Sequence, residues 1–134
     1  MTGACENPFM NPPLLDESQL RQLLDLDDGK ATLLREMAAL FRAETPRRLG
    51  AIQEGINAEN ATAVTEAAHA LKGASGLMGA QLVFTLARDL EIKAKAGNLP
   101  AKEALMEAWS KLNEAVSEAQ DGIDIFLSKV RACP

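Results

Sequence analysis

The C-terminal part of the chain carries an apolar pattern that only a long, one-sided helix satisfies. This spacing places the apolar residues along one seam of an α-helix, as in a helix packed lengthwise in a bundle. Sustained period-two alternation, which would indicate strands, occurs nowhere in the sequence, so the chain is predicted to be all-α. The residues of the seam lie alternately four and three positions apart: Leu105, Trp109, Leu112, Val116, Ala119, Ile123, Phe126 and Val130.

Four further segments show helical spacing and end at turn signals such as Asp28-Gly29 and Gly97-Asn98. Pro46 lies inside the second segment, but the apolar stripe, which includes Leu40, Phe41, Leu49 and Ile52, keeps its register across the proline. That register favours one helix kinked at the proline over two separate helices. The expected helices cover about residues 16–24, 30–57, 60–78 and 80–96, with the last one after Pro100.

Five helices with short connections predict an antiparallel four-helix bundle with a short additional N-terminal helix, spanning residues 14–131. The first 13 residues hold three prolines and two asparagines and show little periodicity. They are predicted to be a flexible N-terminal segment or the end of a linker.

Charge and composition argue against several classes of function. The formal net charge of −5, without a basic stripe, argues against nucleic-acid binding. Apolar runs fall short of the roughly 20 residues that span a bilayer, and the N-terminus lacks a signal-peptide pattern. A cytoplasmic protein is therefore expected. Cys5 and Cys133 form no disulfide framework, although a disulfide between the two ends stays open, and one histidine makes no zinc site.

The only histidine, His69, lies in the middle of the third predicted helix. On a helical wheel its side chain points roughly 140° away from the middle of the core stripe, toward solvent or a partner. The core stripe itself consists of Val64, Ala68, Leu71, Ser75 and Met78.

The residues around His69 leave its side chain accessible to a partner. Gly73 and Gly76 follow on the same outer face, where each costs roughly 1 kcal/mol against alanine and has no evident packing reason. Thr65 lies one turn before the histidine on this face. Lys72, at i+3, is close enough to share a ligand with the imidazole. Gly79 is predicted to end the helix and let the chain turn.

A neutral imidazole near pH 7 is a nucleophile that accepts a phosphoryl group, and a cation at i+3 stabilises the added charge. A lone exposed histidine is more often only a surface residue, and His-Lys pairs occur by chance. The glycines on the same face favour a functional site.

The stretch HALKGASGLMGA, residues 69–80, closely resembles the signature of histidine-containing phosphotransfer (HPt) domains. That signature reads roughly H-x-L-K-G, two small residues, two variable ones, an apolar residue, then G-A. The segments AENATAVTEAAHALKG, GAQLVFTLARDLEIKAKAGN and LLREMAALFRAETPRRLGAI are also similar to the family, over about residues 14–130. Leu77 departs from the pattern, since the family often has a smaller or polar residue there.

The resemblance implies a monomeric bundle that relays phosphoryl groups between receiver-domain aspartates in multistep two-component signalling. His69 is then the phosphoacceptor, on Nε2. Lys72 stabilises the phosphoryl charge, Gly73 leaves room for the partner, and Leu71 anchors the helix in the core. Glu91 occupies a position where a polar side chain near the histidine is common, but no role is assigned to it.

The expected partners are response-regulator receiver domains, including those of hybrid sensor kinases, which supply the acidic pocket and Mg²⁺. The chain itself is expected to bind no cofactor, metal, nucleic acid or membrane, and to be a phosphocarrier, not an enzyme. Thr65, Ala70, Gly76 and Leu77 are the predicted docking residues. The alternative is a helical adaptor that docks a receiver or kinase without transfer. The sequence leaves open which receivers are bound and whether the chain stands alone or ends a hybrid kinase.

Overall fold

The computed structural model describes residues 13–27, 30–97 and 99–132, with side chains placed up to residue 130. This part of the chain forms five α-helices and contains no strand. The helices are α1 (Glu17–Asp25), α2 (Thr32–Asn57), α3 (Ala61–Leu77), α4 (Gln81–Lys95) and α5 (Lys102–Ala132).

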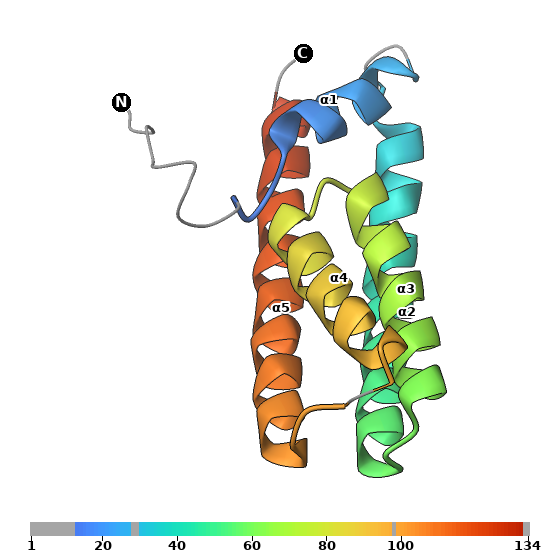
Figure 1. The fold of residues 1–134 in the computed structure, drawn as a ribbon. Helices are drawn as coiled ribbons and strands as arrows, with labels where there is room; N and C mark the ends of the chain where they lie inside the picture. Colours follow the sequence, from blue (N-terminus) through green and yellow to red (C-terminus); the bar gives the residue numbers. More distant parts are fainter. Residues whose placement is uncertain (1–12, 28–29, 98, 133–134) are drawn as a thin grey trace.

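The four long helices run alternately up and down, and α1 lies across one end of them (Figure 1). The α3 helix packs between α2 and α4, while α5 closes the bundle against the same two helices. The prediction of an all-α antiparallel four-helix bundle with a short N-terminal helix is therefore confirmed. The predicted flexible segment, residues 1–13, lies almost wholly outside the described residues, as do Cys5 and Cys133.

The α2 helix continues through Pro46, as the unbroken register of its apolar stripe predicts. Two side-chain hydrogen bonds from α5 hold it near the proline. Gln120 donates to the hydroxyl of buried Thr45 at 2.8 Å, and the Trp109 indole donates to the Leu49 carbonyl at 2.8 Å. These bonds tie α2 to α5 where the proline removes a backbone donor.

The core follows the predicted stripes with one exception. Leu40, which helical spacing assigns to the apolar stripe of α2, is 61% exposed. Its neighbour Phe41 takes the buried position. Consecutive helical residues point about 100° apart, so only one of the two faces the core.

The turn after α3 is held in place by contacts with the start of α1. Gly79 has a φ of +70°, a left-handed conformation that suits glycine, and a Cβ there would lie 2.7 Å from the Asp16 carbonyl oxygen. The Asp16 backbone amide donates to the Gly79 carbonyl at 2.7 Å, and the Gln19 side-chain amide donates to the Leu77 carbonyl at 2.9 Å. The predicted helix-ending role of Gly79 is confirmed, and α1 fixes the end of α3.

The described helices include none that combines the length and apolar character needed to span a bilayer.

Candidate functional site

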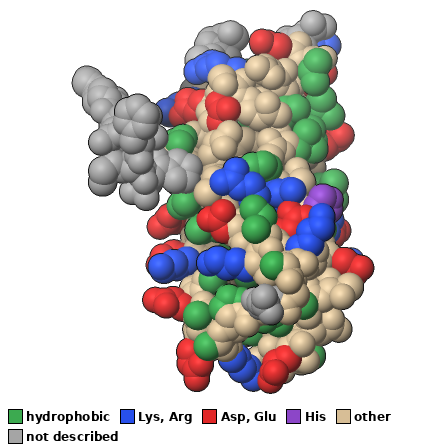
Figure 2. All heavy atoms as spheres, in the orientation of Figure 1, with side chains coloured by type: hydrophobic (Ala, Val, Ile, Leu, Met, Phe, Trp, Pro, Cys, Tyr) green, Lys and Arg blue, Asp and Glu red, His purple; other side chains and the backbone are tan. Residues whose placement is uncertain are grey.

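The His69 side chain stands on the outer face of α3 and is 67% exposed. In the space-filling view it is the purple side chain, among charged neighbours (Figure 2). Val64, Ala68, Leu71 and Ser75 on the opposite side of α3 are all fully buried. Because this core stripe fixes the rotation of the helix, it also fixes the outward direction of the imidazole. The exposed His69 and the buried core stripe both agree with the helical wheel.

A carboxylate from α4 contacts both predicted functional side chains. Oε2 of Glu91 lies 2.8 Å from Nδ1 of His69, and Oε1 lies 2.8 Å from the Lys72 ammonium. The Glu91 side chain is only 12% exposed. Sequence reasoning gave this residue no role. The available signal was the family resemblance, in which a polar side chain near the histidine is common at this position.

Glu91 determines which imidazole nitrogen is free. The hydrogen bond from Lys72, aided by that from His69, holds the pKa of Glu91 below its ordinary value of 4.5, despite desolvation. The ionised carboxylate only accepts hydrogen bonds, so Nδ1 of His69 must carry the proton and donate. In the neutral ring the lone pair then lies on Nε2. Among the described residues, Nε2 has no hydrogen-bond partner, so its lone pair is not engaged within the described part of the chain.

The Lys72 side chain is 25% exposed and lies close to His69, but its ammonium group is already paired with the Glu91 carboxylate. Gly73, one turn after His69, has open space where a Cβ would be, with no atom within 4 Å. Gly76 differs, because a Cβ there would come within 3.3 Å of the Phe84 ring of α4. The interpretation that both glycines lack a packing reason is therefore wrong for Gly76.

The predicted docking residues lie on two sides of the histidine. Thr65 is half-buried beside α4, where it lines a shallow pocket with Ala94 and Lys95, and its hydroxyl donates to the Ala61 carbonyl at 2.8 Å. Gly76 also faces α4.

On the other side, Leu77 is 51% exposed and lines a groove against α2. Half-buried Ala70 lies on the same side of α3, one and two turns before Ala74 and Leu77. The docking role of all four residues stays a prediction. Among the described residues, no three His, Cys, Asp or Glu side chains gather into a metal-binding group.

The Hpt domain family profile matches residues 36–122, which is more than half of the chain and includes the His69 site. The chain belongs to the Hpt domain family. The Hpt fold is also seen in a solved structure, the histidine-containing phosphotransfer protein B (HptB) from Pseudomonas aeruginosa PAO1. That structure aligns with a TM-score of 0.74 and 22% identity, over 91% of this chain and 98% of HptB. No curated protein sequence matches this chain.

Proposed function

We propose that this Hpt protein relays a phosphoryl group between aspartates of receiver domains through a phosphohistidine at His69. The single observation that carries the proposal is the exposed imidazole whose Nδ1 is held by Glu91 at 2.8 Å. The receiver partners, the monomeric state and the expected cytoplasmic location are parts of the same proposal. Mg²⁺ belongs to the receiver and supplies charge neutralisation there.

In the transfer, the lone pair on Nε2 attacks the phosphorus of an aspartyl phosphate. A nitrogen–phosphorus bond forms, the aspartyl oxygen–phosphorus bond breaks, and the aspartate leaves as a carboxylate. Because Nδ1 keeps its proton, the phosphorylated ring carries a positive charge. The Glu91 carboxylate, 2.8 Å from Nδ1, stabilises that charge. Attack by the carboxylate of a second receiver reverses these steps and returns the ring to its neutral state.

Two further residues support the exchange. Gly73 leaves the approach to the imidazole open, which an in-line reaction between two protein surfaces requires. Lys72 is proposed to stabilise the transferred group by sharing its three ammonium donors between Glu91 and a phosphoryl oxygen. Its flexible stem suits a group that arrives and departs.

The test is transfer itself. The wild-type chain and a His69→Ala variant are mixed with phosphorylated receiver domains from the same genome. Intact mass then reports the gain of one phosphoryl group, and acid treatment distinguishes phosphohistidine, which is acid-labile. We expect an acid-labile adduct on the wild type only. Stable binding of a receiver without any adduct would instead support the adaptor alternative.

A further inference from the structure

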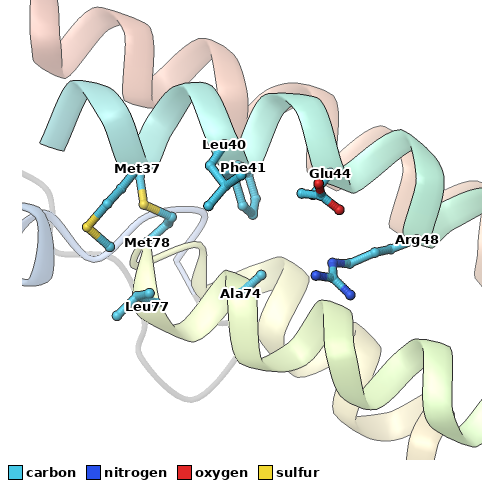
Figure 3. A pocket seen from close by; sticks show the side chains of 8 residues that line it. All are labelled: Met37, Leu40, Phe41, Glu44, Arg48, Ala74, Leu77 and Met78. Carbon is cyan, nitrogen blue, oxygen red and sulfur yellow. The ribbon is translucent and has the colours of Figure 1, made fainter. Parts of the chain in front are cut away.

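A groove runs between α2 and α3 and is lined on α3 by Ala74, Leu77 and Met78, which lie one turn or more after His69. Its volume is about 100 Å³, with Arg48 reaching from α2 toward α3 at one end (Figure 3). An apolar cavity of roughly 150 Å³ holds benzene, so this groove fits one apolar side chain and is too small for an extended ligand. We call it the α2–α3 groove; its lining residues are Met37, Leu40, Phe41, Glu44, Arg48, Ala74, Leu77 and Met78.

Two large apolar side chains of the α2–α3 groove face solvent. Leu40 is 61% exposed and Leu77 is 51% exposed, and they come from neighbouring helices. An apolar patch that spans two helices and surrounds a depression is typical of a surface that a partner covers.

Two charged residues, Glu44 and Arg48, line the α2–α3 groove, and Arg48 is the one with a buried polar atom that lacks a partner. Its Nε atom is buried and lacks a hydrogen-bond partner. Its guanidinium forms no ion pair among the described residues, although Glu44 lies one turn earlier on the same helix. A buried donor without a partner destabilises the free chain, so Arg48 is suited to a partner that supplies the missing acceptor.

Arg48 lies beside the histidine along the bundle axis. A Cβ on Gly55 of α2 would contact Ala63 and Val64 of α3, which fixes how the two antiparallel helices align. Both helices rise by the same amount per residue. Arg48, seven residues before Gly55, is therefore level with residues 70 and 71, directly after His69. A domain that docks over the imidazole and extends across the α2 side of α3 would cover Arg48 as well.

We propose that Arg48 determines which receiver domain is accepted, by binding a surface carboxylate of the receiver while a neighbouring apolar side chain of that receiver enters the α2–α3 groove. This rests on the proposed function and names the recognition element of the same site. Guanidinium and carboxylate match as a planar, two-bond pair, and an apolar side chain beside that carboxylate fits the groove. Arg48 thus acts on the partner and leaves the reactivity of His69 unchanged.

The experiment separates recognition from chemistry. Potassium phosphoramidate, a small phosphoryl donor, labels His69 without any receiver. Receiver domains from the same genome, charged with acetyl phosphate and Mg²⁺, report transfer that requires docking. Each rate is measured for the wild type, Arg48→Glu and a matched control, Arg35→Glu, which makes the same charge change at an exposed position of α2 near its N-terminus. Thermal unfolding verifies that each variant is folded.

For Arg48→Glu we expect kcat/KM from the receiver to fall about tenfold or more, with a weaker salt dependence and unchanged labelling by phosphoramidate. Arg35→Glu should match the wild type. A receiver with Lys in place of the contacted carboxylate should recover transfer to Arg48→Glu and lose it to the wild type. Leu40→Ala should also slow transfer from the receiver, because it removes one wall of the groove.

Four results would overturn the proposal. Equal transfer to Arg48→Glu and the wild type would remove Arg48 from recognition and leave the proposed function standing. Slower phosphoramidate labelling of Arg48→Glu would place the arginine on the phosphoryl group instead of the partner. A wild type that exchanges with no receiver would refute the proposed function itself. Sedimentation of the free chain as a dimer that Leu40→Ala dissociates would assign the groove to a second copy of the chain.

Discussion

The two flanks of α3 differ in how their side chains are satisfied. On the α4 flank, Glu91 pairs with both His69 and Lys72, and Phe84 fills the space beside Gly76. The α2 flank has exposed leucines and a buried arginine Nε without a partner. A flank satisfied within the chain holds a fixed geometry, whereas a flank with unused groups is suited to a second molecule. We therefore propose that the α4 flank serves the chemistry and that the α2 flank serves recognition of the receiver.

The largest effect is expected from a charge on the α2 flank. Leu77→Asp should weaken receiver binding roughly thirtyfold, the loss typical of an interface hot spot, because it desolvates a carboxylate in an apolar contact. Leu77 is 51% exposed, so the bundle should stay folded. Titration calorimetry with the receiver measures the change. Ile92→Asp on α4 is the matched control, because Ile92 is 60% exposed. An equally large loss of receiver binding in that variant would refute the assignment of recognition to the α2 flank.

Glu91→Ala tests the proposed role of the α4 flank in phosphoryl transfer. Phosphoryl transfer should slow about tenfold, while the affinity for the receiver stays unchanged. A tenfold loss is the lower end of the range found when the hydrogen-bond partner of a metal-binding histidine is removed. Stopped-flow transfer and calorimetry measure the two quantities. Glu91→Gln, which keeps an acceptor but loses the charge, should be impaired less.

The imidazole tautomer gives an independent readout. Nitrogen-15 NMR of the wild type should show Nδ1 protonated, while Glu91→Ala should show a mixture of the two tautomers. An unchanged tautomer in Glu91→Ala would refute the positioning role assigned to this carboxylate.

Gly73→Ala tests the cleared approach to the imidazole. The space for its Cβ is empty, so the variant should be more stable by about 1 kcal/mol from helix propensity alone. Transfer should nevertheless become slower, because the methyl group narrows the access of the receiver. Chemical denaturation and transfer rates measure both effects. Gly50→Ala, also without an atom within 4 Å of its Cβ, should gain similar stability at full transfer rate.

Asp16→Ala should have the smallest effect on transfer and a measurable effect on stability. The Asp16 side chain caps α1, with the Ser18 amide donating to it at 3.0 Å, so its loss should cost about 1 kcal/mol at pH 7. The hydrogen bond from the Ser18 side chain, with backbone bonds, holds the pKa of Asp16 below 3.8 in the folded state.

The contribution of ionised Asp16 is therefore present above pH 3.8 and lost as the pH falls through the lower folded value. Melting temperatures from pH 2 to 7 should show the difference between the wild type and Asp16→Ala shrinking in acid. A difference that stays constant down to pH 2 would contradict the role of the charge. Asp16→Asn, which keeps a good N-cap, should lose little at neutral pH.

The sequence by itself determined the elements and the rotation of α3. Apolar residues that repeat every 3.6 positions predict a helix, whereas a repeat of two positions predicts a strand. The five helices and the outward direction of the His69 side chain therefore follow from the spacing of apolar residues alone. The continuity of α2 through Pro46 follows from the register of its apolar stripe. The helix-ending role of Gly79 follows from its place directly after the last apolar residue of the α3 stripe, and its φ of +70° agrees.

Only the tertiary structure decided which side chains meet across helices. Glu91 is 22 positions from His69, and no spacing rule within one helix links them; the α3–α4 packing angle and register do. The same holds for Gly76 against Phe84 and for Arg48 beside the level of His69. Helical periodicity fixes which way a side chain points, but the partner it finds depends on how neighbouring helices slide and rotate against each other, and those choices minimise the energy of the whole packed core.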